Sequence, residues 1–295
     1  MESILKLQNV SKVYGSNVVV NNVSFEIEKG CVCGLLGPNG AGKTTIMKII
    51  MNQIKCEEGN VVCDEKLKVK YLQDVPQFYE FYSIGEYLDF ILNINHYSKE
   101  NDVRINEVLD MLGLKEYKDV TIKKLSRGLR QKVGIASVIV DEPDILILDE
   151  PVSALDPIGR KEMFDIISRL KGKVTIIFSS HILTDVERIC DHIILINKGK
   201  IILNKDLKDV EFDKQTLLVT FKNREDLMML KDKIKYSCFF SEVVKDCLEI
   251  EGNNIDEIQK DIFALLLENN ISVKSVNAKS EDLEEIFLRE VRKNG

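Results

Sequence analysis

The segment GPNGAGKTT at residues 37–45 is the feature that most constrains the fold. It follows an apolar run, CVCGLLG at 31–37, and leads into a helical pattern that begins at Lys43. The pattern G-x-x-x-x-G-K-[ST] binds phosphate when it joins a buried strand to a helix, as it does here. Its glycines let backbone N–H groups point inward around an anion. The sequence therefore predicts a phosphate-binding loop at the carboxyl end of a strand.

Two side chains of this loop are expected to act on a nucleoside triphosphate and its metal ion. Lys43 can reach the β- and γ-phosphates, and the hydroxyl of Thr44 can ligate Mg²⁺. The residues expected to contact the phosphates are Gly37, Pro38, Asn39, Gly40, Ala41, Gly42, Lys43, Thr44 and Thr45. The alternative, a glycine-rich surface turn, is disfavoured because a strand and a helix flank the loop.

A second part of the predicted site is ILILDEP at 145–151. Its continuous apolar run is typical of a strand buried on both faces. Asp149, at the end of this strand, is expected to hold the shell of the Mg²⁺ ion. Glu150 follows directly and can act as the general base that activates a water molecule. Taken without the glycine-rich loop, the two residues would equally fit solvated acids at a strand end.

The segment KKLSRGLRQ at 123–131 predicts the start of a helix with Ser126 at its N-cap. Arg127, Arg130 and Lys132 lie in the first turns, although the helix dipole favours negative charge there. Bare N–H groups at a helix start form an anion site. The glycine-rich loop is expected to wrap the nucleotide of its own chain. The anion expected at Ser126 would therefore have to come from elsewhere. An ordinary capped surface helix is the alternative.

Strand and helix patterns alternate through most of the first 205 residues, which implies a largely parallel α/β sheet. Residues 1–30 alternate as antiparallel strands do, with Val23, Phe25 and Ile27 on one face. Further strands are expected at 31–37, 61–72, 144–150, 173–180 and 191–203, and helices at 43–54, 158–170 and 182–190. The region from 83 to 140 is helical in pattern, and Ser83 with Glu86 forms a capping box.

A chain of 295 residues is longer than one core usually covers, so a second domain is expected. Residues 206–295 fit a small C-terminal α+β domain in which no motif carries chemistry. Its expected strands are 215–221, 247–252 and 271–276, and its expected helices are 223–234, 255–268 and 280–293. In the last helix, acidic residues lead and basic residues trail, as the helix dipole prefers.

Residues 3–205 resemble the ATP-binding subunits of ABC transporters, which carry these motifs in this order. In that family a Leu-Ser-Gly-Gly-Gln signature opens a helix and contacts the γ-phosphate bound by the opposite subunit. Ser126 and Gly128 match the positions that make this contact, whereas Arg127 and Leu129 replace a glycine and the glutamine. The resemblance implies a P-loop ATPase core at 1–205 with an antiparallel β subdomain and a helical subdomain at about 75–140.

Three further residues match family positions. Asp156, the end of SALD, corresponds to the acidic end of a loop that crosses the dimer interface. His181, in SSH, corresponds to the switch histidine that contacts the γ-phosphate and the water. Tyr14 corresponds to the aromatic residue that stacks on adenine, although by composition it could be a packed strand residue. The other two histidines, His96 and His192, are not expected to have such roles.

The stretch KYLQDVPQFYEFYSI at 70–84 resembles the nucleotide-sensing loop that touches the membrane subunit. The family has Tyr-Leu-Pro-Gln here. Alignment without gaps places Asp74 on the glutamine position and Gln73 just before it. Either residue could supply an oxygen near Mg²⁺, and the sequence leaves the two alternatives open.

The resemblance implies an ATPase that binds ATP and Mg²⁺ and powers a separate integral-membrane permease. Two copies, or one copy and a paralogous ATPase, would dimerise around two ATP molecules. The segment LEEIFL at 283–288 resembles the tail of the drug- and antibiotic-exporting branch (ABC-2 type), which favours export. MESILKLQ lacks the pattern of a signal peptide, and no apolar run reaches the ~20 residues that span a bilayer. We therefore expect a cytoplasmic protein, peripheral at the inner face of the cell membrane.

Two other classes of protein fit the sequence less well. A soluble ABC-type ATPase of translation usually carries two cassettes, and one of DNA repair inserts a coiled coil before the signature; this chain shows neither. A small-molecule kinase has no use for the signature or for SALD. A net charge of -7 argues against nucleic acid as the main partner, and none is expected. Seven scattered cysteines suit free thiols in a reducing compartment.

Overall fold

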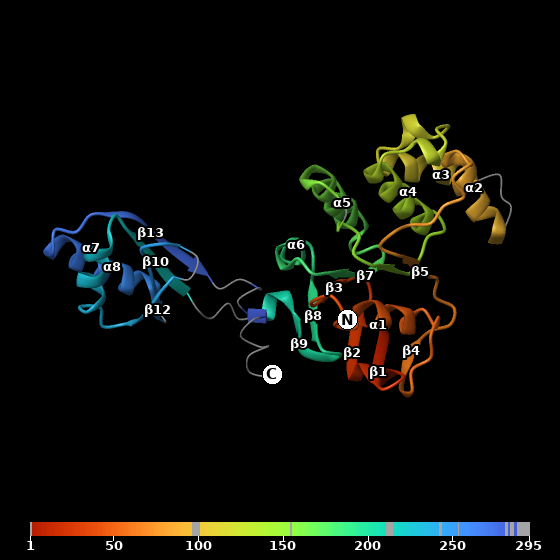
Figure 1. The fold of residues 1–295 in the computed structure, drawn as a ribbon. Coiled ribbons are helices and arrows are strands. Elements are labelled where there is room, and N and C mark those ends of the chain that lie inside the picture. Colours follow the sequence, from red (N-terminus) through yellow and green to blue (C-terminus); the bar gives the residue numbers. More distant parts are fainter. Residues whose placement is uncertain are drawn as a thin grey trace. The chain divides into compact units, whose positions relative to one another are not determined.

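The structure, a computed structural model, describes residues 2–95, 101–153, 155–210, 215–241, 244–252, 254–280, 283 and 286–287. The chain divides into two compact units, of which the first ends at Asp209 and the second begins at Val210 (Figure 1). His96, Ala154 of the SALD segment and most of the expected helix at 280–293 lie outside the described residues. In the part that is described, no helix is both long and apolar enough to cross a membrane.

Six strands of the described residues form the central sheet of the first unit, in the order β5-β6-β7-β3-β8-β9. They are β3 (Val32–Leu36), β5 (Val69–Leu72), β6 (Ile145–Leu148), β7 (Thr175–Ser180), β8 (His192–Asn197) and β9 (Lys200–Asp206). All pair in parallel except β9, which runs antiparallel to β8. Every residue of β3, β6 and β7 is buried, as expected of parallel strands with both faces covered. The predicted α/β class is confirmed.

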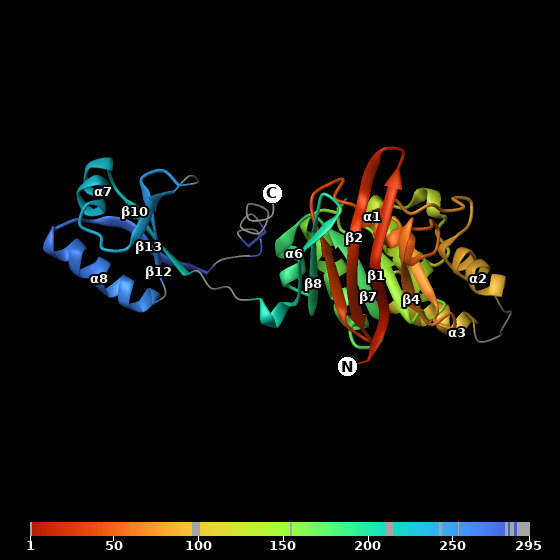
Figure 2. The same cartoon turned by 90° about the horizontal axis from the view of Figure 1, so that it is seen from below.

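A second sheet of the first unit is antiparallel, with the order β2-β1-β4 in the described residues (Figure 2). Its strands are β1 (Ser3–Tyr14), β2 (Asn17–Glu28) and β4 (Glu58–Cys63). Leu5, Phe25 and Ile27 on its inner face share a core with Met47 of α1 (Lys43–Ile50). The single β stretch expected at 61–72 was wrong, because a turn held by Asp64 separates β4 from β5, and the two strands join different sheets.

Three helices gather at one end of the first unit, away from the antiparallel sheet (Figure 1). They are α2 (Ile84–Asn95), α3 (Asn101–Met111) and α4 (Arg127–Ile139), with short 3-10 turns at Lys115–Tyr117 and Ile122–Lys124. The predicted capping box opens α2: the Ser83 N–H donates to Glu86 Oε2 at 2.8 Å, and the Glu86 N–H donates to Ser83 Oγ at 3.3 Å. The α4 helix begins directly after Ser126, as the sequence indicates.

Helices α5 (Pro157–Leu170) and α6 (Leu183–Glu187) connect the remaining strands of the central sheet. Two helices of the first unit are shorter than expected. The helix expected at 43–54 ends at Ile50, where Asn52 takes a φ of 52° that the helix cannot continue. The helix expected at 182–190 ends at Glu187, and the N–H of Ile189 then donates to the carbonyl of Val186, three residues back, as in a turn.

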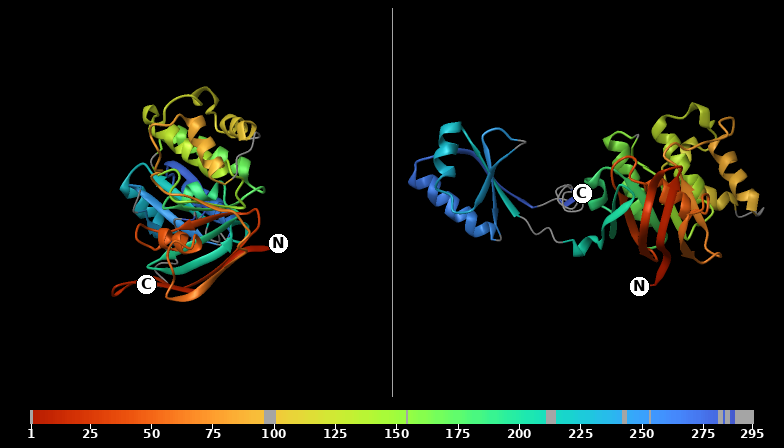
Figure 3. Two further views of the ribbon diagram at one scale, coloured as in Figure 1. Left: turned by 90° about the vertical axis from the view of Figure 1, so that its right-hand side faces the viewer. Right: turned by 60° about the horizontal axis from the view of Figure 1, so that its bottom comes forward.

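The second unit is a β-α-β-β-α-β arrangement of ferredoxin-like type. Its elements are β10 (Gln215–Phe221), α7 (Arg224–Lys231), β11 (Ser237–Phe240), β12 (Cys247–Gly252), α8 (Ile255–Glu268) and β13 (Val273–Ser280). The described strands form an antiparallel sheet in the order β11-β12-β10-β13, and one core joins α7 and α8 to the sheet (Figure 3). The strand β11 was not predicted; it is a short edge strand whose side chains are largely exposed.

The glycine-rich loop reaches its position only because Gly37 has no side chain. With a φ of 150°, a Cβ atom at Gly37 would lie 2.1 Å from the carbonyl oxygen of Ile196 in β8. Backbone of the central sheet would have to move to admit it. Gly172 also has a positive φ, 78°, but a Cβ there would meet nothing within 4 Å. An alanine at Gly172 would therefore meet backbone strain alone, whereas an alanine at Gly37 would meet both strain and steric overlap.

We expect Gly37→Ala to lower the free energy of unfolding by about 3 kcal/mol or more, because overlap adds to strain. Gly172→Ala should lower it by only about 1–2 kcal/mol, the strain alone. Urea denaturation followed by circular dichroism measures both. Equal losses in the two variants would contradict this account of the loop.

Candidate nucleotide-binding site

The glycine-rich loop joins β3 to α1 and folds around its own lysine. The ammonium of Lys43 donates to the carbonyl of Gly37 at 2.6 Å and to that of Pro38 at 3.3 Å. Gly42 is the N-cap of α1, with a φ of 107°, and a Cβ there would lie 2.7 Å from the carbonyl of Val19. A loop that ends at a helix start in this way can offer backbone N–H groups to an anion, as the motif requires.

The carboxylate of Asp149 lies at the carboxyl end of β6 and accepts three hydroxyl hydrogen bonds. Its Oδ2 accepts from Thr44 Oγ1 at 2.9 Å and from the phenol of Tyr71 at 3.0 Å. Its Oδ1 accepts from Ser179 Oγ at 2.7 Å. The structure thus brings together Thr44 and Asp149, the two residues expected to hold Mg²⁺. A hydroxyl beside a carboxylate is an oxygen donor set that suits this hard cation.

Glu150 connects the other two residues that the sequence singles out for catalysis. Its Oε2 lies 2.9 Å from His181 Nδ1, and its Oε1 lies 3.5 Å from Lys43 Nζ. Oε1 is buried and makes no hydrogen bond within the described residues. Lys43, Glu150 and His181 therefore form one chain of contacts along the edge where β3, β6 and β7 end.

The backbone of Glu150 is strained. Its φ is 47°, in the left-handed region that an L-residue enters only at a cost. The N–H of Glu150 donates to Ser179 Oγ at 2.8 Å. Residues held in such conformations concentrate at functional sites, where the surrounding structure fixes them.

Ser126 lies apart from this chain of contacts. Its Oγ accepts from the N–H of Leu129 at 3.3 Å and so caps its own helix, α4. Ser126 is exposed, Gly128 is partly exposed, and no hydrogen bond among the described residues joins Ser126 to the loop at 37–45. The two signature residues therefore remain open at the surface of the unit that carries them.

Two of the three cations near Ser126 have acidic partners. Arg130 forms an ion pair with Glu80 and lies over the ring of Phe78, 5.7 Å from its centroid. Lys132 pairs with Glu162 at 3.0 Å. These contacts explain a positive charge in the first turns of α4 without a bound anion.

Asp156 and Asp74 have local partners. Asp156 is the N-cap of α5 and accepts from the N–H of Gly159 at 2.7 Å. Asp74 accepts from Ser153 Oγ at 2.7 Å, which joins the predicted nucleotide-sensing loop to the SALD segment. Gln73 comes directly after β5, so both candidates for the sensing residue follow the strand that flanks Asp149.

Tyr14 ends β1, and 49 % of its surface is exposed. The ammonium of Lys12 lies 5.2 Å from the ring centroid and also bonds Glu57 at 2.7 Å. An exposed ring of this kind suits stacking, and the role of Tyr14 with adenine stays a prediction.

Tyr71 and Ser179 are parts of this site that no sequence pattern indicated. Both reach Asp149 through strand register: Leu72 pairs with Leu148, and Leu148 pairs with Phe178, which places Ser179 beside Asp149. Burial and the Asp149 carboxylate raise the pKa of Tyr71 well above its ordinary value, so the phenol keeps its proton. The signal that would have found these residues is the pairing of the strands.

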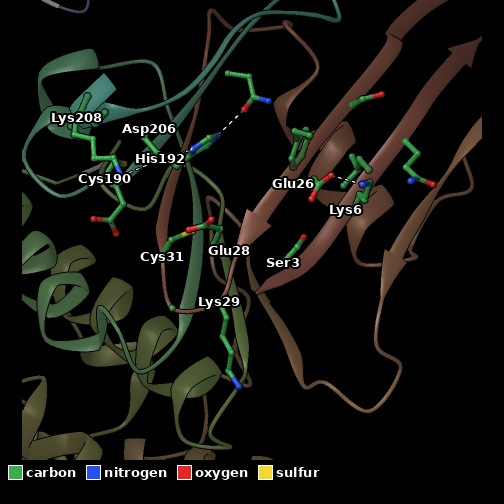
Figure 4. Close-up of a pocket in the computed structure, with 18 of the residues that line it drawn as sticks. Ser3, Lys6, Glu26, Glu28, Lys29, Cys31, Cys190, His192, Asp206 and Lys208 are labelled. Atoms are coloured by element: carbon green, nitrogen blue, oxygen red, sulfur yellow. Dashed lines mark hydrogen bonds and ion pairs between the residues drawn. The ribbon is translucent and has the colours of Figure 1, made fainter. Parts of the chain in front are cut away.

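A separate hollow of about 1450 Å³ opens at the opposite edge of the central sheet, where β3 and β8 begin (Figure 4). None of the predicted site residues lines it. Several of its charged side chains pair with one another: Lys6 with Glu26, His192 with Asp206 at 2.8 Å, and Lys208 with Asp206 at 3.1 Å. The hollow lacks an excess of either charge among these groups, and we assign it no ligand.

Comparison with known proteins gives the same family. The sequence profile described as "ABC transporter" matches residues 20–153. YcbN of Bacillus subtilis, an uncharacterized ABC transporter ATP-binding protein, is 33% identical over 100% of this chain and 99% of its own. The bacitracin transport ATP-binding protein BcrA of Bacillus licheniformis is 31% identical over 98% of this chain and 97% of its own.

A solved structure agrees with these relatives. The protein cbiO1 of Clostridium perfringens, part of an ABC transporter complex, has a TM-score of 0.63 and 27% identity over 71% of this chain and 91% of its own. The two relatives align with this chain over nearly their whole length, and the solved structure has the same fold. The chain therefore belongs to the ATP-binding subunits of ABC transporters, the ATPases that work with the membrane components of these complexes.

Proposed function

We propose that two copies of this chain close around two ATP molecules and hydrolyse them to drive a membrane permease. Lys43 and Thr44 of one copy and Ser126 and Gly128 of the other would hold each nucleotide. The observation that carries the proposal is the chain of contacts from Lys43 through Glu150 to His181. The exposed signature residues support the second half of the proposal, since a second copy can reach them.

Each side chain has a defined task in this proposal. The carboxylate of Glu150 takes the proton of the attacking water. His181 Nδ1, hydrogen-bonded to Glu150, holds that carboxylate in place, and Lys43 exchanges its loop carbonyls for the β- and γ-phosphates. Thr44 and Asp149 would hold Mg²⁺, which neutralises charge that develops on the phosphates.

Closure of the two copies depends on the γ-phosphate. Hydrogen bonds from Ser126 and Gly128 to this anion are charge-assisted and contribute roughly 1.5–3 kcal/mol each. Hydrolysis removes the group that bridges the copies, so the dimer opens again. This is a two-state element that the nucleotide switches.

The permease is proposed to contact an exposed apolar surface beside Asp74. Val75, Tyr79 and Phe81, in the segment between β5 and α2, are 59%, 55% and 73% exposed. Neighbouring exposed apolar side chains of this kind mark interaction sites. Asp74 directly precedes Val75 in the chain, and the ion pair between Glu80 and Arg130 connects this segment to α4. A position at the inner face of the cell membrane follows from this contact.

Outward transport is part of the proposal. The bacitracin transport ATP-binding protein aligns with this chain over nearly its full length, including the second unit. The cargo would pass through the permease, so the residues of this chain would recognise nucleotide and permease only. Fractionation of cells tests the partner: the protein should sediment with membranes, whereas a ribosome- or DNA-bound ATPase would not.

Lys43→Ala should reduce ATP turnover by at least about a hundredfold, because a preorganised cation at the phosphates is lost. Phosphate release at saturating Mg-ATP measures the effect. Lys48→Ala, on the same helix, is the matched control and should retain wild-type turnover. Normal turnover by Lys43→Ala would contradict the site.

Glu150→Gln should bind ATP yet lose turnover by about 10²–10⁴-fold, because the amide cannot accept the proton of the water. With Mg-ATP it should elute as a dimer in size-exclusion chromatography. Glu142→Gln is the control, since Glu142 also has a left-handed backbone, with a φ of 49°, but lies at an exposed turn. Hydrolysis by Glu150→Gln at the wild-type rate would place the base elsewhere.

Ser126→Arg should lower turnover at least about tenfold while the affinity of the monomer for ATP stays unchanged. The added side chain blocks the helix start that the second nucleotide needs. Asn223→Ala, which removes the N-cap of α7 in the second unit, controls for a lost cap, which costs about 1 kcal/mol. Equilibrium binding of a fluorescent ATP analogue and phosphate release separate the two quantities, and a parallel loss of both would contradict the shared site.

A further inference from the structure

We propose that Ser179 and Tyr71 are positioning residues for ATP hydrolysis. Their hydroxyls fix the carboxylate of Asp149, and Ser179 also fixes the backbone of Glu150. The inference rests on the proposed function of Asp149 and Glu150, and it assigns roles to two residues to which the family resemblance gives none.

One hydroxyl serves two functional residues in succession. Ser179 Oγ donates its proton to Asp149 Oδ1 at 2.7 Å and accepts from the N–H of Glu150 at 2.8 Å. Its side chain is completely buried, with 0% exposure. Ser179 Oγ makes both hydrogen bonds at the same time. A rotation of the Asp149 carboxylate would therefore disturb the hydroxyl that holds the backbone of Glu150.

The hydrogen bond from the Glu150 N–H to Ser179 Oγ stabilises the strained backbone of Glu150. Glu150 takes a φ of 47°, which directs its carboxylate toward His181 and Lys43. A buried N–H without a partner is costly, so the acceptor offered by Ser179 stabilises this conformation over an ordinary extended one. Without Ser179 Oγ, the backbone of Glu150 loses the group that offsets its strain.

Tyr71 holds the other oxygen of Asp149. Its phenol donates to Oδ2 at 3.0 Å, the same oxygen that accepts from Thr44 at 2.9 Å. When Thr44 serves a metal ion, Tyr71 and Ser179 still hold both carboxylate oxygens.

The structure offers a matched control for each residue. Thr175, on the same strand as Ser179, accepts from the N–H of Gly30 at 2.9 Å, far from the carboxylates. Tyr236 donates to Asp261 at 2.7 Å in the second unit, the same pairing of phenol and carboxylate as Tyr71 with Asp149. Thr175→Val and Tyr236→Phe therefore remove comparable hydrogen bonds and should leave turnover unchanged.

In the full chain, Ser179→Ala and Tyr71→Phe should each lower kcat by about 10–100-fold, as the loss of a group that orients a metal-holding residue does. The KM for ATP and the affinity for ATP in EDTA should stay within a factor of about two, because the substrate contacts remain. A merely structural role would instead lower thermal stability and ATP affinity together with kcat.

A second measurement needs no metal and no turnover. Hydrogen exchange of the Glu150 amide, followed in the nucleotide-free protein, should accelerate in Ser179→Ala, because its acceptor is gone. The same amide should keep its protection in Tyr71→Phe and in Thr175→Val. This pattern separates the bond to the backbone from the bond to the carboxylate.

Turnover in both variants equal to that of the two controls would overturn the inference, as would unchanged exchange at Glu150 in Ser179→Ala. If Ser179→Ala does not fold, Tyr71→Phe alone decides through its kcat. The proposed function is tested separately: an inactive Glu150→Gln with an active Ser179→Ala refutes the positioning role only. An active Glu150→Gln refutes the proposed base itself.

Discussion

The parallel pairing of β3, β7 and β6 is the constraint on which the site depends. Parallel strands end at the same edge of a sheet, so the loop after β3, Asp149 after β6 and His181 after β7 meet there. The pairing of Leu148 with Phe178 fixes which residues become neighbours. A shift of one residue would turn Asp149 away from Ser179, because alternate side chains of a strand face opposite sides.

Lys43 and Glu150 contact groups of their own chain in this structure. Lys43 bonds the carbonyl of Gly37 and lies 3.5 Å from Glu150, while His181 holds the other oxygen of Glu150. A triphosphate would replace these contacts of Lys43 with stronger, charge-assisted ones. The signature residue Ser126 caps its own helix at the surface, so the unit by itself forms half of the proposed phosphate site.

Local sequence predicted the parts of the site that lie next to one another in the chain. The loop at 37–45 and the pair Asp149 and Glu150 follow from spacing, and His181 follows from the family resemblance. Tyr71 and Ser179 could not be found this way, because strand register brings them to Asp149 from distant segments. The edge strand β11 was missed for a related reason, since its exposed residues depend on pairing with β12 rather than on an apolar pattern.

A structure of the protein with a non-hydrolysable ATP analogue and Mg²⁺ would show whether two copies share each nucleotide. We expect two copies, with the γ-phosphate between Lys43 of one and Ser126 of the other. A ligand fully enclosed by one copy, with Ser126 of every copy remote from phosphate, would contradict this expectation.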